Sequence, residues 1–169
     1  IMSILISPMI VPLIITAAGM FFFYARINLV YTFTGVILAH VALATPFVVI
    51  TVTATLVGFD MNMVKAAQSL GAKPMRTFFK VIMPLILPGI ISGALFAFIT
   101  SFDEVVIVMF MASIDQLTIP KQMWAGIRQE ISPVILCMAT CLVILSIVLL
   151  TTVELLRRRA ERLRGIKAR

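Results

Sequence analysis

Four long apolar runs, separated by short polar connections, dominate the hydrophobic pattern of the chain. They cover roughly residues 5–23, 34–57, 85–108 and 133–153. A hydrocarbon core of ~30 Å needs about 20 helical residues at a rise of 1.5 Å each, so each run is long enough to cross a membrane. Four strands are too few to close a barrel, and an open sheet edge is not stable in lipid. The pattern therefore predicts an all-α integral membrane protein with four spanning helices.

The polar stretch between the second and third runs, which we call the central segment (residues 59–84), has helical character of its own. Helix-forming residues predict a short helix over residues 61–70. Gly71 fits the helix C-terminus, where a positive φ is required. A second helix is expected to follow, with Pro84 and Pro88 bending it into the third run.

Composition agrees with a lipid environment. Of the 169 residues, 62% are hydrophobic and only 12% are charged, and the mean hydropathy is +1.14. A soluble domain carries about 25% charged residues, so this chain lacks the polar residues to cover a water-exposed surface. Cys137 and Cys141 lie four residues apart inside the fourth run. We expect them to be small apolar packing residues, with no disulfide or metal site.

The charges are segregated, which predicts the orientation of the chain. The formal net charge is +7, and 11 of the 14 basic residues lie either in the central segment or in the tail, residues 157–169. The positive-inside rule places these two segments in the cytoplasm and the loop over residues 112–132 outside. We expect one transmembrane domain over residues 1–156, followed by a basic cytoplasmic tail. This distribution argues against a nucleic-acid partner.

The central segment resembles the coupling-loop signature of binding-protein-dependent ABC transporter permeases, the MetI-like family. That signature is Glu-Ala-Ala, three residues, Gly, nine residues, then Ile-x-Leu-Pro. Here Lys65-Ala66-Ala67 is followed after three residues by Gly71, and after nine more by Val81-Ile82-Met83-Pro84. The spacing matches throughout, but Lys65 replaces the family's glutamate. From the residues alone, a basic loop could equally serve only to fix topology or lie on anionic lipid.

The resemblance extends over about residues 4–150. The stretches LAHVALATPFVV, SFDEVVIVMFM and LTIPKQMWAGIRQEISPVI are most similar to the spermidine/putrescine permease branch. The family fold has six spanning helices, with the coupling loop between the fourth and fifth. The resemblance therefore implies that the four runs are the last four helices and that the chain is an N-terminally truncated fragment.

The resemblance also implies a function. The chain is expected to be a permease subunit of an ABC importer for polyamines, in the bacterial cytoplasmic (inner) membrane. Its partners would be an ATP-binding subunit, a second permease subunit and a periplasmic or lipid-anchored substrate-binding protein. The sequence has no G-x-x-x-x-G-K-[ST] phosphate loop, so we expect no enzyme and no cofactor in this chain, with ATP and Mg on the ATP-binding subunit. Other solutes (an iron chelate, an anion or an amino acid) and an ion-driven secondary transporter fragment remain alternatives.

Three residues are candidates for the substrate pathway: His40, Asp103 and Glu104. An acid near the bilayer centre costs roughly 2.5–3.5 kcal/mol, so it usually faces protein, water or a charge of opposite sign. Because adjacent helical residues diverge by about 100°, we expect one acid to line the pathway and the other to be structurally paired. The alternative is that neighbouring helices or headgroups satisfy both. For His40, a helix-to-helix hydrogen bond is the favoured role and a pathway role the second.

Small residues and prolines predict the packing of the runs. Pro8, Pro12 and Pro46 are expected to bend their helices. Gly89 and Gly93 lie four residues apart in the third run, which is typical of close helix packing. Their partner is either a second permease or another helix of this chain.

Overall fold

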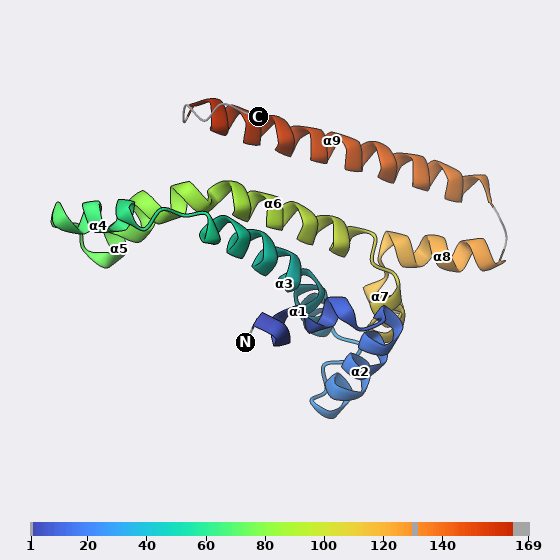
Figure 1. Cartoon of the computed structure of the whole chain (residues 1–169). Coiled ribbons are helices and arrows are strands. Elements are labelled where there is room, and N and C mark those ends of the chain that lie inside the picture. The colour runs from blue at the N-terminus through green and yellow to red at the C-terminus, as the bar shows by residue number, and fades with distance from the viewer. Residues whose placement is uncertain (1, 130–131, 164–169) are drawn as a thin grey trace.

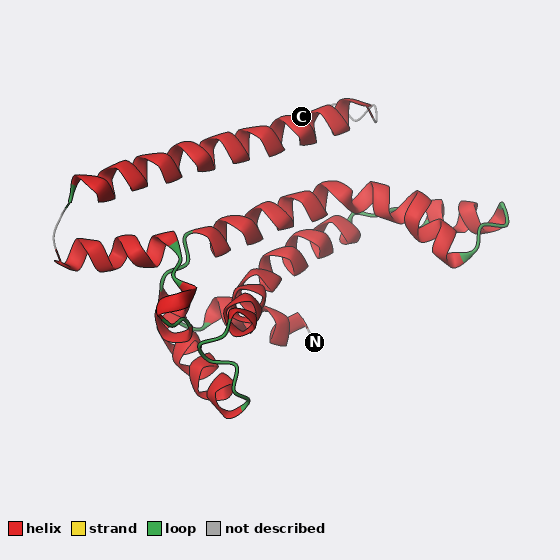
Figure 2. Ribbon diagram, turned by 180° about the vertical axis from the view of Figure 1, so that it is seen from behind, coloured by secondary structure: helices red, strands yellow, loops and turns green. Residues whose placement is uncertain are grey.

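The computed structural model describes residues 2–129 and 132–163, and every regular element within them is helical (Figures 1 and 2). The elements are α1 (Met2–Ile10), α2 (Leu13–Arg26), α3 (Phe33–Val57), α4 (Asn62–Ser69), α5 (Pro74–Thr77), the π-helical turn η1 (Phe78–Ile82), α6 (Met83–Phe102), α7 (Val106–Met111), the 3₁₀ turn η2 (Ile114–Gln116), α8 (Ile119–Gln129) and α9 (Pro133–Leu163). The predicted all-α class is confirmed.

Three helices are long and apolar enough to cross a membrane: Phe33–Val57, Pro74–Phe102 and the part of α9 up to Leu155. The first predicted run is interrupted, because α1 and α2 meet at an angle of 115°. Pro12 precedes α2 with an extended backbone (φ −52°, ψ 132°) and has no N–H to continue the helix. The described residues therefore contain three helices able to span a membrane, or four if α1 and α2 together form one bent span.

The third run differs from its predicted form at both ends. Pro84 and Pro88 do not interrupt the helix, since α5, η1 and α6 form one continuous helix of 29 residues from Pro74 to Phe102. In η1 the N–H of Met83 bonds to the carbonyl of Phe78, five residues back. Such a wider turn accommodates an extra residue without breaking the helix. At its other end the helix stops at Phe102, not near residue 108.

Helices α3 and α6 form the tightest pair in the described chain, and two glycines explain why. A Cβ atom on Gly89 would overlap the side chain of Thr55, and one on Gly93 would overlap the Thr51 hydroxyl and lie 2.9 Å from the Cα of Val48. The hydroxyls of both threonines donate to carbonyls of their own helix. The glycine pair therefore packs against another helix of this chain.

A second cluster joins α2, α3 and α7. Ala17, Ala39, Leu43, Ile107 and Met111 are buried together, and the N–H of Tyr31 donates to the carbonyl of Met111 at 2.9 Å. This cluster holds α7 against the α3–α6 pair.

Helix α9 runs beside α6 (Figures 1 and 2) and contacts it at only a few positions. None of the residues in the most apolar 18-residue stretch of α9 is buried. Cys137 and Cys141 are free and exposed on it, so no described residue covers these two expected packing residues. Helix α9 continues to Leu163, which makes the first part of the predicted tail helical, while residues 164–169 lie outside the described residues.

Candidate functional site

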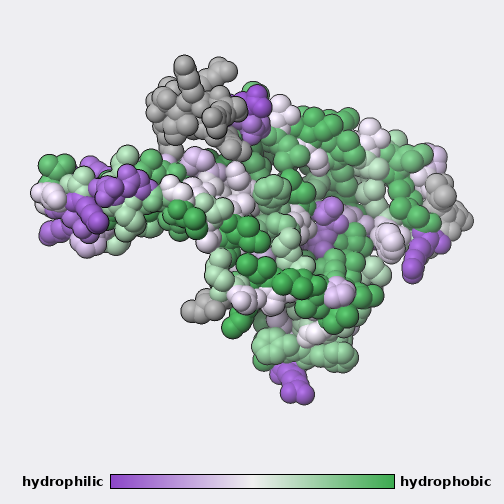
Figure 3. All heavy atoms as spheres, in the orientation of Figure 1, coloured by the Kyte–Doolittle hydropathy of each residue, from purple (hydrophilic) through white to green (hydrophobic). Residues whose placement is uncertain are grey.

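The central segment projects from one end of the α3–α6 pair (Figure 1). Helix α4, the turn at Gly71 and helix α5 form its tip, and hydrophilic side chains gather there while apolar side chains cover much of the rest of this face (Figure 3). The C-terminal end of α9 lies at the same end of the molecule, and α8 lies at the opposite end (Figure 1). The molecule is therefore polar at the tip of the central segment and apolar along the long helices.

Helix α4 has defined boundaries at both ends. At its start, the N–H of Asn62 donates to the carboxylate of Asp60 at 2.9 Å. At its end, Gly71 has a φ of +79°, as predicted from the sequence. The N–H of Gly71 donates to Gln68 and that of Ala72 donates to Ala67, which is the Schellman pattern. These bonds satisfy the last carbonyls of α4 and turn the chain sharply into α5.

The structure brings four of the five predicted coupling residues together. Lys65 and Ala66 are exposed on α4, Ala67 is half-buried beside them, and Gly71 is exposed at the turn. No other atom lies within 4 Å of the position where a Cβ on Gly71 would be. Pro84 is separate, since it lies half-buried in the first turn of α6. Helix α4 thus presents a small-residue surface that a second protein can approach closely.

A mostly apolar cavity of about 560 Å³ lies between α3 and α6, near the other end of the pair, and is also lined by the start of α8 and by Leu142 of α9. His40 and Glu104 line it together with Ser101, Thr118 and several apolar residues. Nδ1 of His40 and Oγ of Ser101 lie 2.8 Å apart in a hydrogen bond. His40 therefore makes the expected helix-to-helix hydrogen bond. Its partner was not identified from the sequence, because the two residues are 61 positions apart.

The two neighbouring acids differ in their surroundings. Glu104 is 6% exposed, and its Oε1 accepts the N–H of Ile107 at 2.6 Å. Asp103 is exposed and lines a second cavity of about 480 Å³, with Trp124 and Ser146 among its other lining residues. The expectation that both acids lie on one continuous helix is wrong, since α6 ends before them. The two acids line different cavities because the helix ends before both of them.

Helix α8 is amphipathic and lies at the end of the molecule opposite the central segment (Figure 1). The Arg128 guanidinium lies 5.8 Å from the centre of the Trp124 ring. Lys121 Nζ donates to the carbonyl of Ala112 at 2.9 Å, and partial burial lowers the pKa of Lys121. An aromatic residue and two cations on one such helix are typical of a membrane–water interface.

The family model described as "Binding-protein-dependent transport system inner membrane component" matches residues 1–162. The chain belongs to this family. Members of this family are inner-membrane components of transport systems, and the described residues include several apolar helices long enough to span a membrane. Membership of this family agrees with the signature spacing in the central segment, which the structure forms into α4, the Gly71 turn and α5.

Several curated permeases are similar to this member of the family. The chain is 30% identical over 151 residues to the spermidine/putrescine transport system permease protein PotC of Haemophilus influenzae, covering 89% of this chain and 59% of the relative. It is 30% identical to PotC of Escherichia coli K12, covering 89% and 57%. It is 37% identical over 103 residues to the putrescine transport system permease protein PotI of the same strain, covering 61% and 37%. The chain thus spans less than three-fifths of the length of these relatives.

Proposed function

We propose that this chain is a transmembrane permease subunit of an ATP-driven importer of polyamines. The observation that carries the proposal is the central segment, an exposed small-residue helix with a positive-φ glycine turn at the end of a tightly packed helix pair. Relatives that match 89% of the chain are named as spermidine/putrescine permeases. In this assignment the chain does no covalent chemistry, and ATP and Mg bind to a separate ATP-binding subunit.

The helical path supports a mechanical role for the central segment. The continuous helix from Pro74 to Phe102 is about 44 Å long at 1.5 Å per residue. It links the Gly71 turn to the cavity that contains Ser101 and Glu104. Since Gly89 and Gly93 leave no space between α6 and α3, a force applied at α4 moves both helices together. An ATP-binding subunit seated on α4 would thereby open and close the cavity.

Charge supports the orientation that this role requires. The central segment and the C-terminal end of α9 lie at the same end of the molecule (Figure 1), and both carry basic clusters in the sequence. The positive-inside rule places this end in the cytoplasm, where ATP is available. The opposite end, with α8, then faces the substrate-binding protein. Lys65, in place of the family's glutamate, is expected to meet an acidic residue of the ATP-binding subunit.

The cavity between α3 and α6 suits a polyamine. A polyamine has ammonium groups separated by apolar methylene chains. Glu104 supplies a carboxylate and His40 a second polar group, while apolar side chains such as those of Val36, Ile37 and Phe98 line much of the rest. Only one oxygen of Glu104 accepts a hydrogen bond from the described residues, which leaves the other for a cation. Asp103 is a second acid near the same level, and a second permease subunit would complete the pathway.

Uptake by membrane vesicles tests the proposal. Vesicles that contain this chain and its partners should accumulate radiolabelled putrescine or spermidine only when ATP and Mg are inside. Excess unlabelled polyamine should compete, whereas an amino acid, an anion or an iron chelate should not. Competition by one of those solutes instead would assign a different substrate. Uptake that needs an ion gradient and no ATP would indicate a secondary transporter.

A further inference from the structure

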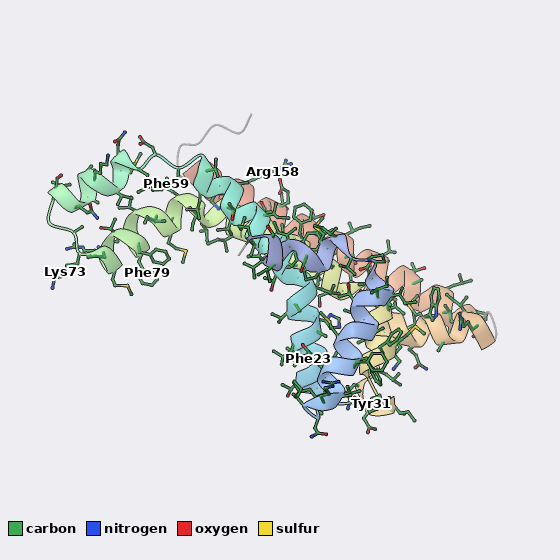
Figure 4. The ribbon with its side chains drawn as sticks, turned by 60° about the horizontal axis from the view of Figure 1, so that its bottom comes forward. Phe23, Tyr31, Phe59, Lys73, Phe79 and Arg158 are labelled. Carbon is green, nitrogen blue, oxygen red and sulfur yellow. The ribbon has the colours of Figure 1, made fainter. Side chains whose placement is uncertain are left out.

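One surface of the central segment takes no part in the proposed coupling. Along α5 and η1, Met75 and Phe79 lie one turn apart, as do Arg76 and Lys80, so an apolar stripe runs beside a basic stripe. All four side chains are exposed, Phe79 by 57%. We call these four residues the basic–aromatic surface. Figure 4 shows Phe79 on the side of the segment away from α4.

The opposite side of the same helix is covered. Thr77 lies nearly half a turn from Met75 and Phe79 at about 100° per residue, and it is only 2% exposed. Helix α4 packs on α5 and η1. The ATP-binding subunit proposed to seat on α4 therefore approaches from a different side, which leaves the basic–aromatic surface for another partner.

The basic–aromatic surface lies at the level of lipid headgroups. The uncharged run over residues 81–102 begins directly after Lys80. Its 22 residues would span about 33 Å, which matches a hydrocarbon core of ~30 Å. Lys80 is thus at the boundary of that core, and Arg76 lies about 6 Å further out, within the headgroup layer. Long basic side chains and aromatic rings are typical of this level.

The positive charge of this surface is not balanced by the residues that the structure describes. Among residues 2–129 and 132–163, no carboxylate forms an ion pair with Arg76 or Lys80, whereas Arg158 pairs with Glu154 at 2.8 Å. The tail beyond α9 adds more basic residues at the same end of the molecule. The complementary partner is an anion with an apolar portion, presented at the membrane surface.

We propose that Arg76, Lys80 and Phe79 bind an anionic phospholipid of the cytoplasmic leaflet. The arginine and lysine contact the headgroup phosphate, and the phenyl ring packs on the first carbons of the acyl chains. Attraction to an anionic leaflet contributes about a fivefold preference for each basic side chain near the surface. Bound lipid would keep α5 at the headgroup level as α4, α5 and α6 move together with the ATP-binding subunit. This inference goes beyond the proposed transport function and does not depend on the substrate.

A fluorescent reporter on the surface tests the proposal. The variant Phe79→Trp with Trp124→Phe has a single tryptophan at residue 79, since Trp124 is the only tryptophan of the chain. The full chain is placed in phosphatidylcholine vesicles in which brominated phosphatidylglycerol or brominated phosphatidylcholine serves as quencher. We expect the phosphatidylglycerol to associate at least fivefold more strongly at this site, and Arg76→Gln with Lys80→Gln to reduce the ratio to about one.

Matched variants keep the test decisive. Arg26→Gln with Arg128→Gln removes two exposed basic residues elsewhere and should leave the ratio unchanged. Arg76→Lys with Lys80→Arg keeps the charge and should keep the preference, which separates loss of charge from misfolding. A ratio near one in the reporter, or a ratio that survives the double glutamine variant, overturns the proposal. The proposal is also overturned if the double glutamine variant no longer co-purifies with the ATP-binding subunit while the lipid ratio stays unchanged. That result would make this surface a protein contact.

Discussion

At the scale of single residues, Glu104 carries the substrate hypothesis. It is the acid in the cavity with His40 and Ser101, and it also accepts the N–H of Ile107 in the first turn of α7. A glutamine at this position keeps an acceptor oxygen for that N–H and removes only the charge. The amide variant is therefore a clean probe of cation binding.

We expect Glu104→Gln to raise the KM for polyamine uptake about tenfold or more, because a hydrogen bond to a charged group contributes roughly 1.5–3 kcal/mol. Asp103→Asn should have a smaller effect, since Asp103 lines a different cavity. Initial uptake rates over a range of polyamine concentrations measure both variants. Wild-type kinetics in both would remove the two acids from the pathway.

Thr77 provides a test of stability at the same scale. Its hydroxyl is buried without a hydrogen-bond partner among the described residues, and such a group costs about 1–3 kcal/mol. We expect Thr77→Val to raise the free energy of unfolding by about 1 kcal/mol in a denaturation titration in detergent. Thr32→Val is the matched control, because Thr32 Oγ1 accepts the N–H of Gly35 and donates to Leu29. The Thr32→Val variant should lower the free energy of unfolding by about 1 kcal/mol.

Local geometry was predictable at this scale and distant contacts were not. The positive φ of Gly71 follows from neighbouring residues, since only glycine adopts it readily at the end of a helix. The bond between His40 and Ser101 depends on how α3 lies against α6, which one sequence does not specify. The end of α6 at Phe102 was missed because the apolar pattern continues through Val105–Met111 in the second buried cluster.

At the scale of elements, the contact between α3 and α6 determines how the molecule moves. The glycine spacing predicts close packing but not the partner helix. The structure identifies α3 as that partner, through threonines and a valine on the facing side. Similarly, the prolines predict bends, and a sharp one occurs at Pro12, where α1 and α2 meet at 115°. Pro84 lies in the first turn of α6, next to the wider π turn, and the helix continues through it.

We expect Gly93→Ala to separate α3 from α6 and to lower the free energy of unfolding by about 1–3 kcal/mol, because the added methyl overlaps helix α3. Gly19→Ala is the control, since no atom lies within 4 Å of the position of its Cβ. It should be neutral or stabilising by up to about 1 kcal/mol, as expected for alanine in a helix. Equal stability of both variants would mean that α3 and α6 are not in close contact.

At the scale of the whole molecule, the proposed function requires the two ends of the molecule to lie on opposite sides of the membrane. The central segment and the end of α9 lie together, and α8 lies at the other end (Figure 1). The positive-inside rule predicts this arrangement from charge alone. What the sequence does not predict is the projection of α4 and α5 beyond the helix pair, which makes α4 accessible to a partner.

Labelling of single cysteines tests this arrangement. In a background with Cys137→Ala and Cys141→Ala, Lys73→Cys should react with a membrane-impermeant maleimide only from the cytoplasmic side. Asp115→Cys, in the loop before α8, should react only from the outer side. Both residues are exposed, so accessibility should depend on sidedness. Reaction of Lys73→Cys from outside would invert the orientation.

The most direct test of the central claim is a cross-link between α4 and the ATP-binding subunit. In the same background, Ala66→Cys is treated with a short bifunctional thiol reagent in membranes that contain the whole transporter. We predict a cross-linked product with the ATP-binding subunit from Ala66→Cys, with a yield that changes when ATP is added. Phe79→Cys, on the side of the segment away from α4, should give none. If Ala66→Cys gives no cross-linked product in a transporter that still imports polyamine with ATP, the ATP-binding subunit does not seat on α4. That result would contradict the central claim.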